Sequence, residues 1–268
     1  MTDRMLVLFR CVKIPRFEAD VLQTLESQLG RKFRLVNILE WTTQMGFSVR
    51  NNRVTGIGLY NCGVSTLPES ITKLDTLETL DLENNKFTTL PESITKLTSL
   101  KKLGLGDNKF TTLPESIGNL SSLKELKLYR NQLSTLPESI GQLSSLRELS
   151  LYENKLSTLP ESISNLKSLV YLYLSGNEFT TLPDSITQLK SLGWLDLSGN
   201  EFTTLPESIT KLDTLRTLVF KNNKLTTLAE SINNLTSLKN LFISINPLDS
   251  RAQSILKQLK KNGVYVSA

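Results

Sequence analysis

Asparagine recurs at one fixed interval along most of this 268-residue chain. Eight asparagines stand 23 residues apart, and each ends the phrase Leu-x-x-Leu-x-Leu-x-x-Asn, with Phe220 and Ile243 taking the third leucine position in the last two copies. They are Asn85, Asn108, Asn131, Asn154, Asn177, Asn200, Asn223 and Asn246. A fixed short period of this kind predicts a solenoid, in which each repeat forms one coil and neighbouring coils stack.

One repeat, residues 77–99, shows how the apolar side chains are used. An extended segment alternates its side chains between two faces, and a return arm brings further apolar side chains back to the same interior. The inward set is Leu77, Leu80, Leu82, Phe87, Leu90, Ile94 and Leu97. Burying such a set contributes roughly 10–20 kcal/mol, whereas ordering the backbone costs roughly 1–2 kcal/mol per residue. Each repeat must therefore share its apolar surface and its strand hydrogen bonds with its neighbours.

The asparagine lies at the bend between the strand and the return arm. Buried backbone groups at a bend lack ladder partners, and a side-chain amide offers donors and an acceptor in a fixed geometry. We interpret the asparagines as a structural ladder that bridges successive coils. A proline begins most return arms and is followed by Glu or Asp, which favours a short helix or 3-10 turn there. These prolines are Pro68, Pro91, Pro114, Pro137, Pro160, Pro183 and Pro206, and Ala229 takes the place in the last arm.

The repeat LPESIxxLxxLxxLxLxxNxLxx resembles the leucine-rich repeat family over about residues 54–248, and it is similar to the 23-residue LPxxI subgroup. That subgroup occurs in prokaryotic proteins, such as leptospiral ones, and in intracellular Ras-group and plant relatives. The resemblance implies an α/β fold: a curved solenoid with a parallel β-sheet on the concave face and short helical or 3-10 turns on the convex face. It also implies a role in protein binding, without naming the partner.

The two ends differ from the repeats and are predicted to be caps, because an open stack would otherwise expose its core and its strand edges. Residues 1–53 read as an N-terminal cap with an amphipathic helix over 17–29, followed by a hairpin around Asn51 and Asn52. Residues 54–248 hold nine repeats. Residues 249–268 read as a C-terminal cap with a closing helix and a short strand. Residues 33–41 fit either an extended or a helical segment.

Composition limits the compartment and the partners. Two cysteines, Cys11 and Cys62, are too few for disulfide-bonded caps, no signal peptide is evident, and no stretch is long enough to span a membrane. We expect a cytoplasmic protein, with non-classical secretion as the alternative. The net charge is +5, but the repeats hold 18 basic and 20 acidic residues, so the excess lies in the caps. This distribution argues against a nucleic-acid partner, which would require a basic stripe along one face. The oligomeric state is not indicated.

The candidate binding face follows from the positions between the leucines. If the leucines point inward, these variable positions emerge on the concave sheet, where four of the six tyrosines and one of the two tryptophans gather. Exposed aromatic and arginine side chains are typical anchors of protein interfaces, although stacked aromatics also stabilise a sheet by cross-strand packing. The candidate partner-binding residues are Tyr129, Tyr152, Tyr171, Tyr173 and Trp194, with Lys127, Arg130 and Arg147 beside them.

No catalytic constellation is visible in the sequence. Histidine is absent, and neither a phosphate-binding loop nor a metal-ligand spacing occurs. We therefore predict a non-enzymatic scaffold without metal or cofactor that holds a protein or peptide on its concave face. One alternative is a secreted or surface-attached bacterial adhesin or effector. An alternative of another class is a carboxylate-dependent enzyme.

Overall fold

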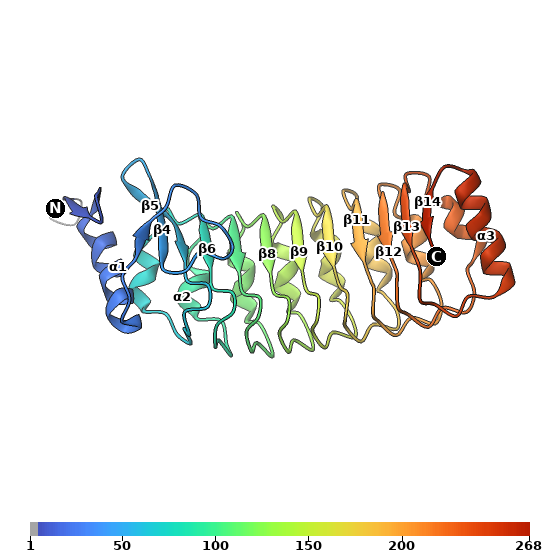
Figure 1. Ribbon diagram of the computed structural model, residues 1–268, viewed down its shortest axis with the longest axis horizontal. Helices are drawn as coiled ribbons and strands as arrows, with labels where there is room; N and C mark the ends of the chain where they lie inside the picture. Colours follow the sequence, from blue (N-terminus) through green and yellow to red (C-terminus); the bar gives the residue numbers. More distant parts are fainter. Residues whose placement is uncertain (1–4) are drawn as a thin grey trace. The chain divides into compact units, whose positions relative to one another are not determined.

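The computed structural model describes residues 5–268, and it divides into two compact units, the first ending at Asn131 and the second running from Gln132 to Ala268. This division falls inside the repeats. The predicted boundaries between caps and repeats stay predictions. In each unit the strands lie side by side in one sheet, and short helical turns pack behind it (Figure 1).

The first unit begins with a hairpin and a helix that the sheet does not include. Strands β1 and β2 are antiparallel, and α1 ends at Gly30, whose φ of 62° is the left-handed conformation that favours glycine. The sheet order is β3-β4-β5-β6-β7-β8, in which the β4–β5 pair is antiparallel and the other pairs are parallel. The elements are β1 Leu6–Phe9, β2 Val12–Pro15, α1 Arg16–Leu29, β3 Arg34–Leu35, β4 Gly46–Arg50, β5 Arg53–Gly58, η2 Glu69–Lys73, β6 Thr79–Asp81, α2 Glu92–Thr95, β7 Lys102–Gly104, η3 Glu115–Asn119 and β8 Glu125–Lys127.

The second unit is a parallel sheet closed by a helix. Its order is β9-β10-β11-β12-β13-β14, and Asp249 caps α3 by accepting a hydrogen bond from the amide of Ala252 at 2.7 Å. The elements are η4 Glu138–Gln142, β9 Glu148–Ser150, η5 Glu161–Asn165, β10 Tyr171–Tyr173, η6 Asp184–Gln188, β11 Trp194–Asp196, η7 Glu207–Lys211, β12 Thr217–Val219, η8 Glu230–Asn234, β13 Asn240–Phe242, α3 Ser250–Lys261 and β14 Tyr265–Ser267.

A buried carboxylate joins helix α1 to strand β5. Glu18 on α1 is fully buried and accepts hydrogen bonds from the amide of Val54 at 2.8 Å and from Nε of Arg53 at 2.5 Å. Burial raises the pKa of the Glu18 carboxyl. The hairpin between β4 and β5 turns at Asn51 and Asn52, whose φ angles of 52° and 60° match the turn that two-residue hairpins favour. Sequence reasoning anticipated this hairpin but left residues 1–12 without an assignment.

The repeats are held from inside by leucine rows and at each bend by an asparagine. Asn108 is buried, and its Nδ2 donates to the carbonyl of Leu82 in the preceding repeat at 3.0 Å. Its Oδ1 accepts from the amide of Phe87, also in the preceding repeat, at 3.0 Å. Further Nδ2 contacts reach carbonyls of its own repeat, so one amide satisfies several buried backbone groups. In every hydrogen bond that joins two repeats in this way, the asparagine contacts the repeat that precedes it in the sequence.

The prolines have a different role from the one expected. They precede the short turns instead of forming their first helical residue: Pro137, with φ of −70°, stands before η4. Its carbonyl accepts the amide of Ile140 at 3.1 Å, which is the first hydrogen bond of the turn. The fixed φ of proline suits this position and its carbonyl starts the turn, whereas the missing N–H has no consequence there. Ala229 supplies the same carbonyl to the amide of Ile232 in the last arm.

Candidate functional site

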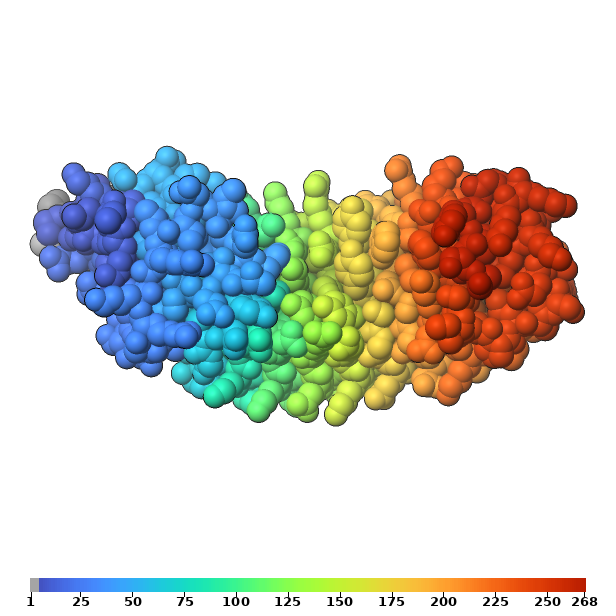
Figure 2. Space-filling model, viewed as in Figure 1, coloured from blue at the N-terminus to red at the C-terminus, as the bar shows by residue number. Residues whose placement is uncertain are grey.

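The sheet face opposite the leucine rows, which we call the outer sheet face, differs between the two units. In the first unit, residues 36–45 between β3 and β4 fold over this face (Figure 2). The ring of Trp41 lies so close to Gly104 that a Cβ there would come within 2.6 Å of it. Likewise, at Gly58 on β5, the carbonyl oxygen of Thr43 lies 2.6 Å from the place that a Cβ would take. Glycine is required at both positions because no side chain fits under the covering segment.

The covered part of the first unit contains two carboxylates. Asp81, between Gly58 and Gly104 on the adjacent strands, is fully buried, and Glu83 is 3% exposed. Oδ1 of Asp81 accepts the amide of Glu83 at 2.9 Å, whereas Oδ2 of Asp81 meets no partner in the described part of the chain. Burial raises the pKa of Asp81 to about 8, with the Glu83 charge adding to the rise and Lys127 opposing it. Both carboxylates are thus enclosed within the first unit.

Three of the predicted binding residues belong to this first unit, and each contacts groups of that unit. Lys127 places its Nζ 4.0 Å from the centre of the Trp41 ring. Tyr129 donates to Glu83 at 2.7 Å, and its ring covers Gly106 so closely that a Cβ would lie 2.5 Å from it. Arg130 lies at a left-handed turn with φ of 49°, with its guanidinium 3.9 Å from Asp107.

In the second unit, the aromatic residues predicted to bind a partner lie on adjacent strands. Tyr171 on β10 and Trp194 on β11 are register partners, as the 23-residue spacing predicted. The closer ring contact is the diagonal one, in which the rings of Tyr173 and Trp194 are 6.4 Å apart at centroids and inclined by 47°. Tyr171 is 43% exposed. Burial, followed by the Glu148 charge, raises the pKa of the Tyr173 hydroxyl.

The remaining predicted residues, Tyr152 and Arg147, flank β9 in the same unit. Tyr152 follows β9 and is half-buried, whereas Arg147 precedes it and is exposed. The backbone carbonyl of Arg147 accepts the amide of Val170 at 2.9 Å, which joins it to the strand that carries Tyr171 and Tyr173. The structure thus brings the predicted aromatic residues of the second unit onto one sheet.

A cavity of about 490 Å³ opens beside Trp194, where the strands β10 to β12 begin. Sequence reasoning did not identify it, although Gly193 was a signal, because the same repeat position holds arginine, lysine or valine in the other copies of this unit. The indole Nε1 of Trp194 is buried and donates to no acceptor within the described residues. The lining residues are Val170, Tyr171, Ser191, Gly193, Trp194, Thr214, Arg216, Thr217 and Ser237.

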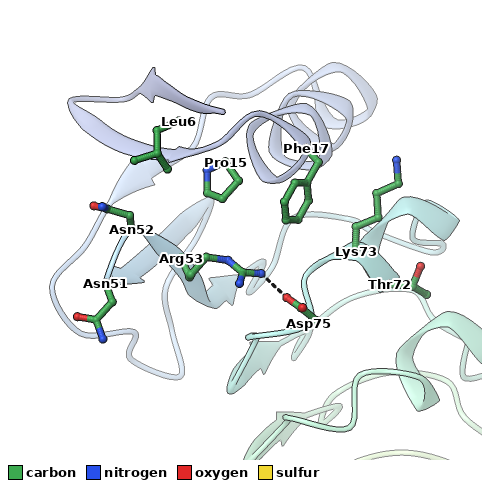
Figure 3. A pocket seen from close by; sticks show the side chains of 9 residues that line it. All are labelled: Leu6, Pro15, Phe17, Asn51, Asn52, Arg53, Thr72, Lys73 and Asp75. Carbon is green, nitrogen blue, oxygen red and sulfur yellow. Dashed lines mark hydrogen bonds and ion pairs between the residues drawn. The ribbon is translucent and has the colours of Figure 1, made fainter. Parts of the chain in front are cut away.

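A second cavity, of about 880 Å³, lies in the first unit between the N-terminal hairpin, α1 and the first return arm (Figure 3). Phe17 and Pro15 form its apolar wall, and Arg53 crosses it to pair with Asp75. The same guanidinium also pairs with the buried Glu18 and lies 5.7 Å from the centre of the Phe17 ring. The positive charge of Arg53 is therefore already paired with carboxylates of the protein. The residues that line the cavity form no catalytic arrangement.

Two searches bear on the chemistry of residues 5–268. No cluster of three or more cysteine, aspartate or glutamate side chains in that range has the geometry to hold a metal ion. No helix in the same range has the length and apolar character needed to cross a membrane.

Comparison with known proteins identifies the repeats. A family model for a leucine-rich repeat region matches residues 56–134 and 162–262, and a leucine rich repeat model matches residues 121–179. Among solved structures, the chain is similar to a leucine-rich repeat protein of Leptospira interrogans at 34% sequence identity and a TM-score of 0.65. That alignment covers 84% of this chain and 61% of the Leptospira protein, so the chain spans less than two thirds of its relative.

Two further structures share the fold. An internalin from Listeria monocytogenes aligns at 20% identity and a TM-score of 0.68 over 92% of this chain and 69% of the internalin, which shows the fold alone. A protein described as a TDR receptor aligns at 28% identity and a TM-score of 0.57 over 73% of this chain and 39% of the receptor. A comparison with curated proteins found no match. The matched repeats, the parallel sheets and the 3-10 turns agree, and the chain belongs to the leucine-rich repeat family.

Proposed function

We propose that this protein is a non-enzymatic scaffold that holds a protein or peptide partner on the outer sheet face of its second unit. Membership of the leucine-rich repeat family suggests a protein-interaction scaffold in general terms. The observation that carries the more specific proposal is the group formed by Tyr171, Tyr173 and Trp194 on two adjacent strands. Large aromatic side chains that keep part of their surface in solvent are the usual anchors of protein interfaces.

The contrast between the units supports this choice of surface. In the first unit, the outer sheet face is occupied by the protein's own residues, with Trp41 over Gly104 and Tyr129 over Gly106. In the second unit, Tyr171 is 43% exposed, although a parallel sheet usually covers its aromatic residues. We therefore rest the proposal on Tyr152, Tyr171, Tyr173, Trp194 and Arg147. Lys127, Tyr129 and Arg130 remain candidates whose contacts lie in the first unit.

The proposal is tested by affinity capture with the double variant Tyr171→Ala and Trp194→Ala. Truncating a central aromatic anchor costs about 2 kcal/mol or more of binding, so partner recovery from a lysate of the source organism should fall at least tenfold. The control is Tyr60→Ala, because Tyr60 is a half-buried tyrosine of the first unit and is not one of the residues of the proposed surface. Equal recovery by the wild type and the double variant, with both proteins folded, would refute the proposal.

Location and catalysis remain predictions of the sequence. Fractionation of the source cells tests the cytoplasmic location against secretion or surface attachment. An activity screen with hydrolase and transferase substrates tests the expected absence of catalysis. A hydrolytic activity lost on replacing Asp81 or Glu83 would revive the carboxylate-dependent alternative.

A further inference from the structure

One row of residues lies just before the strands of the second unit, and we call it the edge row. It consists of Arg147, Val170, Gly193, Arg216 and Lys239. Each amide donates to the carbonyl of the preceding member: Val170 to Arg147, Gly193 to Val170 and Arg216 to Gly193 at 2.9 Å, and Lys239 to Arg216 at 2.8 Å. The members are therefore direct neighbours, about 4.8 Å apart in the direction of the strand ladder.

Gly193 makes a notch in this row. Apart from the two chain neighbours Leu192 and Trp194, a Cβ placed on Gly193 would have only Val170 within 4 Å among the described residues, at the ordinary contact distances of 3.8 and 3.9 Å. Neither a close neighbour nor a left-handed φ therefore requires glycine there, in contrast to Gly104 and Gly58. The missing side chain leaves room, and the cavity of about 490 Å³ occupies it. Because the fold does not require glycine at this position, the open space beside Gly193 is available to a ligand.

The groups around the notch are hydrogen-bond donors. Arg216, which carries a guanidinium, and Trp194 both line the cavity, and the Nε1 of Trp194 is buried without an acceptor in the described part of the chain. The hydroxyl of Thr217 accepts from Asn240 at 3.2 Å, which leaves its proton free to donate, and Ser237 adds a further hydroxyl. Among the described residues, no aspartate or glutamate lines the cavity. A surplus of donors without a carboxylate favours a ligand that carries negative charge.

The positive charges of the edge row also lack ion-pair partners. Within residues 5–268, no carboxylate forms an ion pair with Arg147, Arg216 or Lys239. In the first unit, Lys101 at the same repeat position pairs with Glu78 at 2.9 Å, whereas Lys124 forms no ion pair with a carboxylate of residues 5–268. The cations of the second unit are therefore available to charges from outside the chain.

We propose that the edge row binds an extended acidic segment of the partner, with one carboxylate in the Gly193 notch against Arg216 and a second carboxylate at Arg147. This inference rests on the proposed function, since it names the chemistry of the partner that the same unit would hold. Two strand spacings, or about 10 Å, separate Arg147 from the Gly193 notch, and three spacings, or about 14 Å, separate it from Arg216, whereas three to four residues of an extended peptide span about 10–13 Å. The segment should therefore carry Asp or Glu at positions three or four apart. Carboxylate is favoured over phosphate because each site offers one guanidinium and not an arginine cluster.

The test uses a displayed library of random 12-residue peptides, selected against the immobilised full-length chain. Enriched peptides are then labelled and titrated by fluorescence anisotropy against the wild type, Arg216→Gln, Arg147→Gln and Gly193→Val. The valine should fold normally, because its Cβ meets only ordinary contacts and Val170 already occupies the neighbouring position. The control is the double variant Lys190→Gln and Lys211→Gln, which removes charge from exposed residues of the return arms.

We expect enriched peptides with acidic residues three or four apart. Their affinity should fall at least about tenfold in Arg216→Gln and in Gly193→Val, fall in Arg147→Gln, and stay unchanged in the control. Selection that yields no binder, peptides without an acidic bias, or equal binding to Arg216→Gln and Gly193→Val would overturn the inference. Binding by a phosphoserine version of the peptides but not by the carboxylate version would overturn the choice of carboxylate.

The same peptides separate this inference from the proposed function. The peptides could bind equally well to the edge-row variants but lose affinity in Trp194→Ala or Tyr171→Ala. That result would support the aromatic binding surface and refute the acidic segment. If binding depends on none of these residues, both proposals fail.

Discussion

Replacing Asp81 by asparagine should stabilise the protein increasingly as the pH rises. The carboxyl of Asp81 is fully buried beneath residues 36–45, and burial raises its pKa from 3.8 to about 8. Between these two values the folded protein binds one proton more than the unfolded chain at this site. The free energy of unfolding therefore falls as pH rises, and the contribution of protonated Asp81 is complete below about pH 4 and lost by about pH 8. Asparagine does not titrate, so the variant lacks this loss.

The magnitude follows from the pKa shift. A shift of one pKa unit corresponds to 1.36 kcal/mol, so the three pH units between pH 5 and pH 8 amount to about 4 kcal/mol. The Oδ1 of asparagine can still accept the amide of Glu83, as Oδ1 of Asp81 does at 2.9 Å. We expect the stability of Asp81→Asn, relative to the wild type, to increase by about that amount between pH 5 and pH 8. Titration of Glu83 occurs in both proteins and enters the difference only through its coupling to Asp81.

Urea unfolding at several pH values measures this difference. Trp194→Phe in both proteins leaves Trp41, which covers Gly104 beside Asp81, as the fluorescent reporter. Asp196→Asn is the matched control, because Asp196 accepts the amide of Ser198 at 2.9 Å in the same way but is only partly buried. A stability difference between Asp81→Asn and the wild type that stays constant within about 1 kcal/mol from pH 5 to pH 8 would refute the reasoning.

Three further substitutions test the repeat and its cap by urea unfolding. Asn200→Ala should lower the free energy of unfolding by about 3–5 kcal/mol, because several buried backbone groups lose their partner, and a loss under 1 kcal/mol would contradict this. Glu18→Ala should destabilise the first unit by about 3–5 kcal/mol, because the amide of Val54 and Nε of Arg53 lose their acceptor, and Glu18→Gln should recover part of the loss. Gly141→Ala should lower the free energy of unfolding by about 1–3 kcal/mol, because its Cβ would lie 2.4 Å from a backbone oxygen of the next repeat. Gly193→Ala should lower it little, because its Cβ would meet only ordinary contacts. Equal losses of stability in the two variants would contradict the packing argument.

The repeats could be predicted almost completely from the sequence. Their period fixes which side chains point inward, and Leu172 and Leu195 are fully buried and in register, as the spacing requires. The closing helix was also readable, since its apolar stripe and terminal lysines follow general rules for helices. In these segments each local preference agrees with the neighbouring repeat, so the same information is present many times.

The covering segment could not be predicted, because it occurs once. Nothing periodic connects Trp41 with Gly104, more than sixty positions later in the sequence. The glycines at Gly58 and Gly104 were visible as gaps in the row of side chains, but a gap does not identify what fills it. The burial of Asp81 escaped notice for the same reason. The notch at Gly193 was likewise visible as a missing side chain, and only the contacts around it separate an open gap from a filled one.

The backward direction of the asparagine bonds has a consequence for how such a chain can change its length. Asn85 accepts the amides of Cys62 and Val64 and donates to the carbonyl of Leu59, so the first repeat, with cysteine in its asparagine position, is completed by the second. Every repeat that is followed by another repeat receives these hydrogen bonds from the asparagine of that following repeat. A duplication or deletion of one whole 23-residue block therefore leaves every junction chemically complete, whereas a gain or loss of a single residue would misalign the amide from its acceptors. Copy number can vary in evolution while the structure of each junction is preserved.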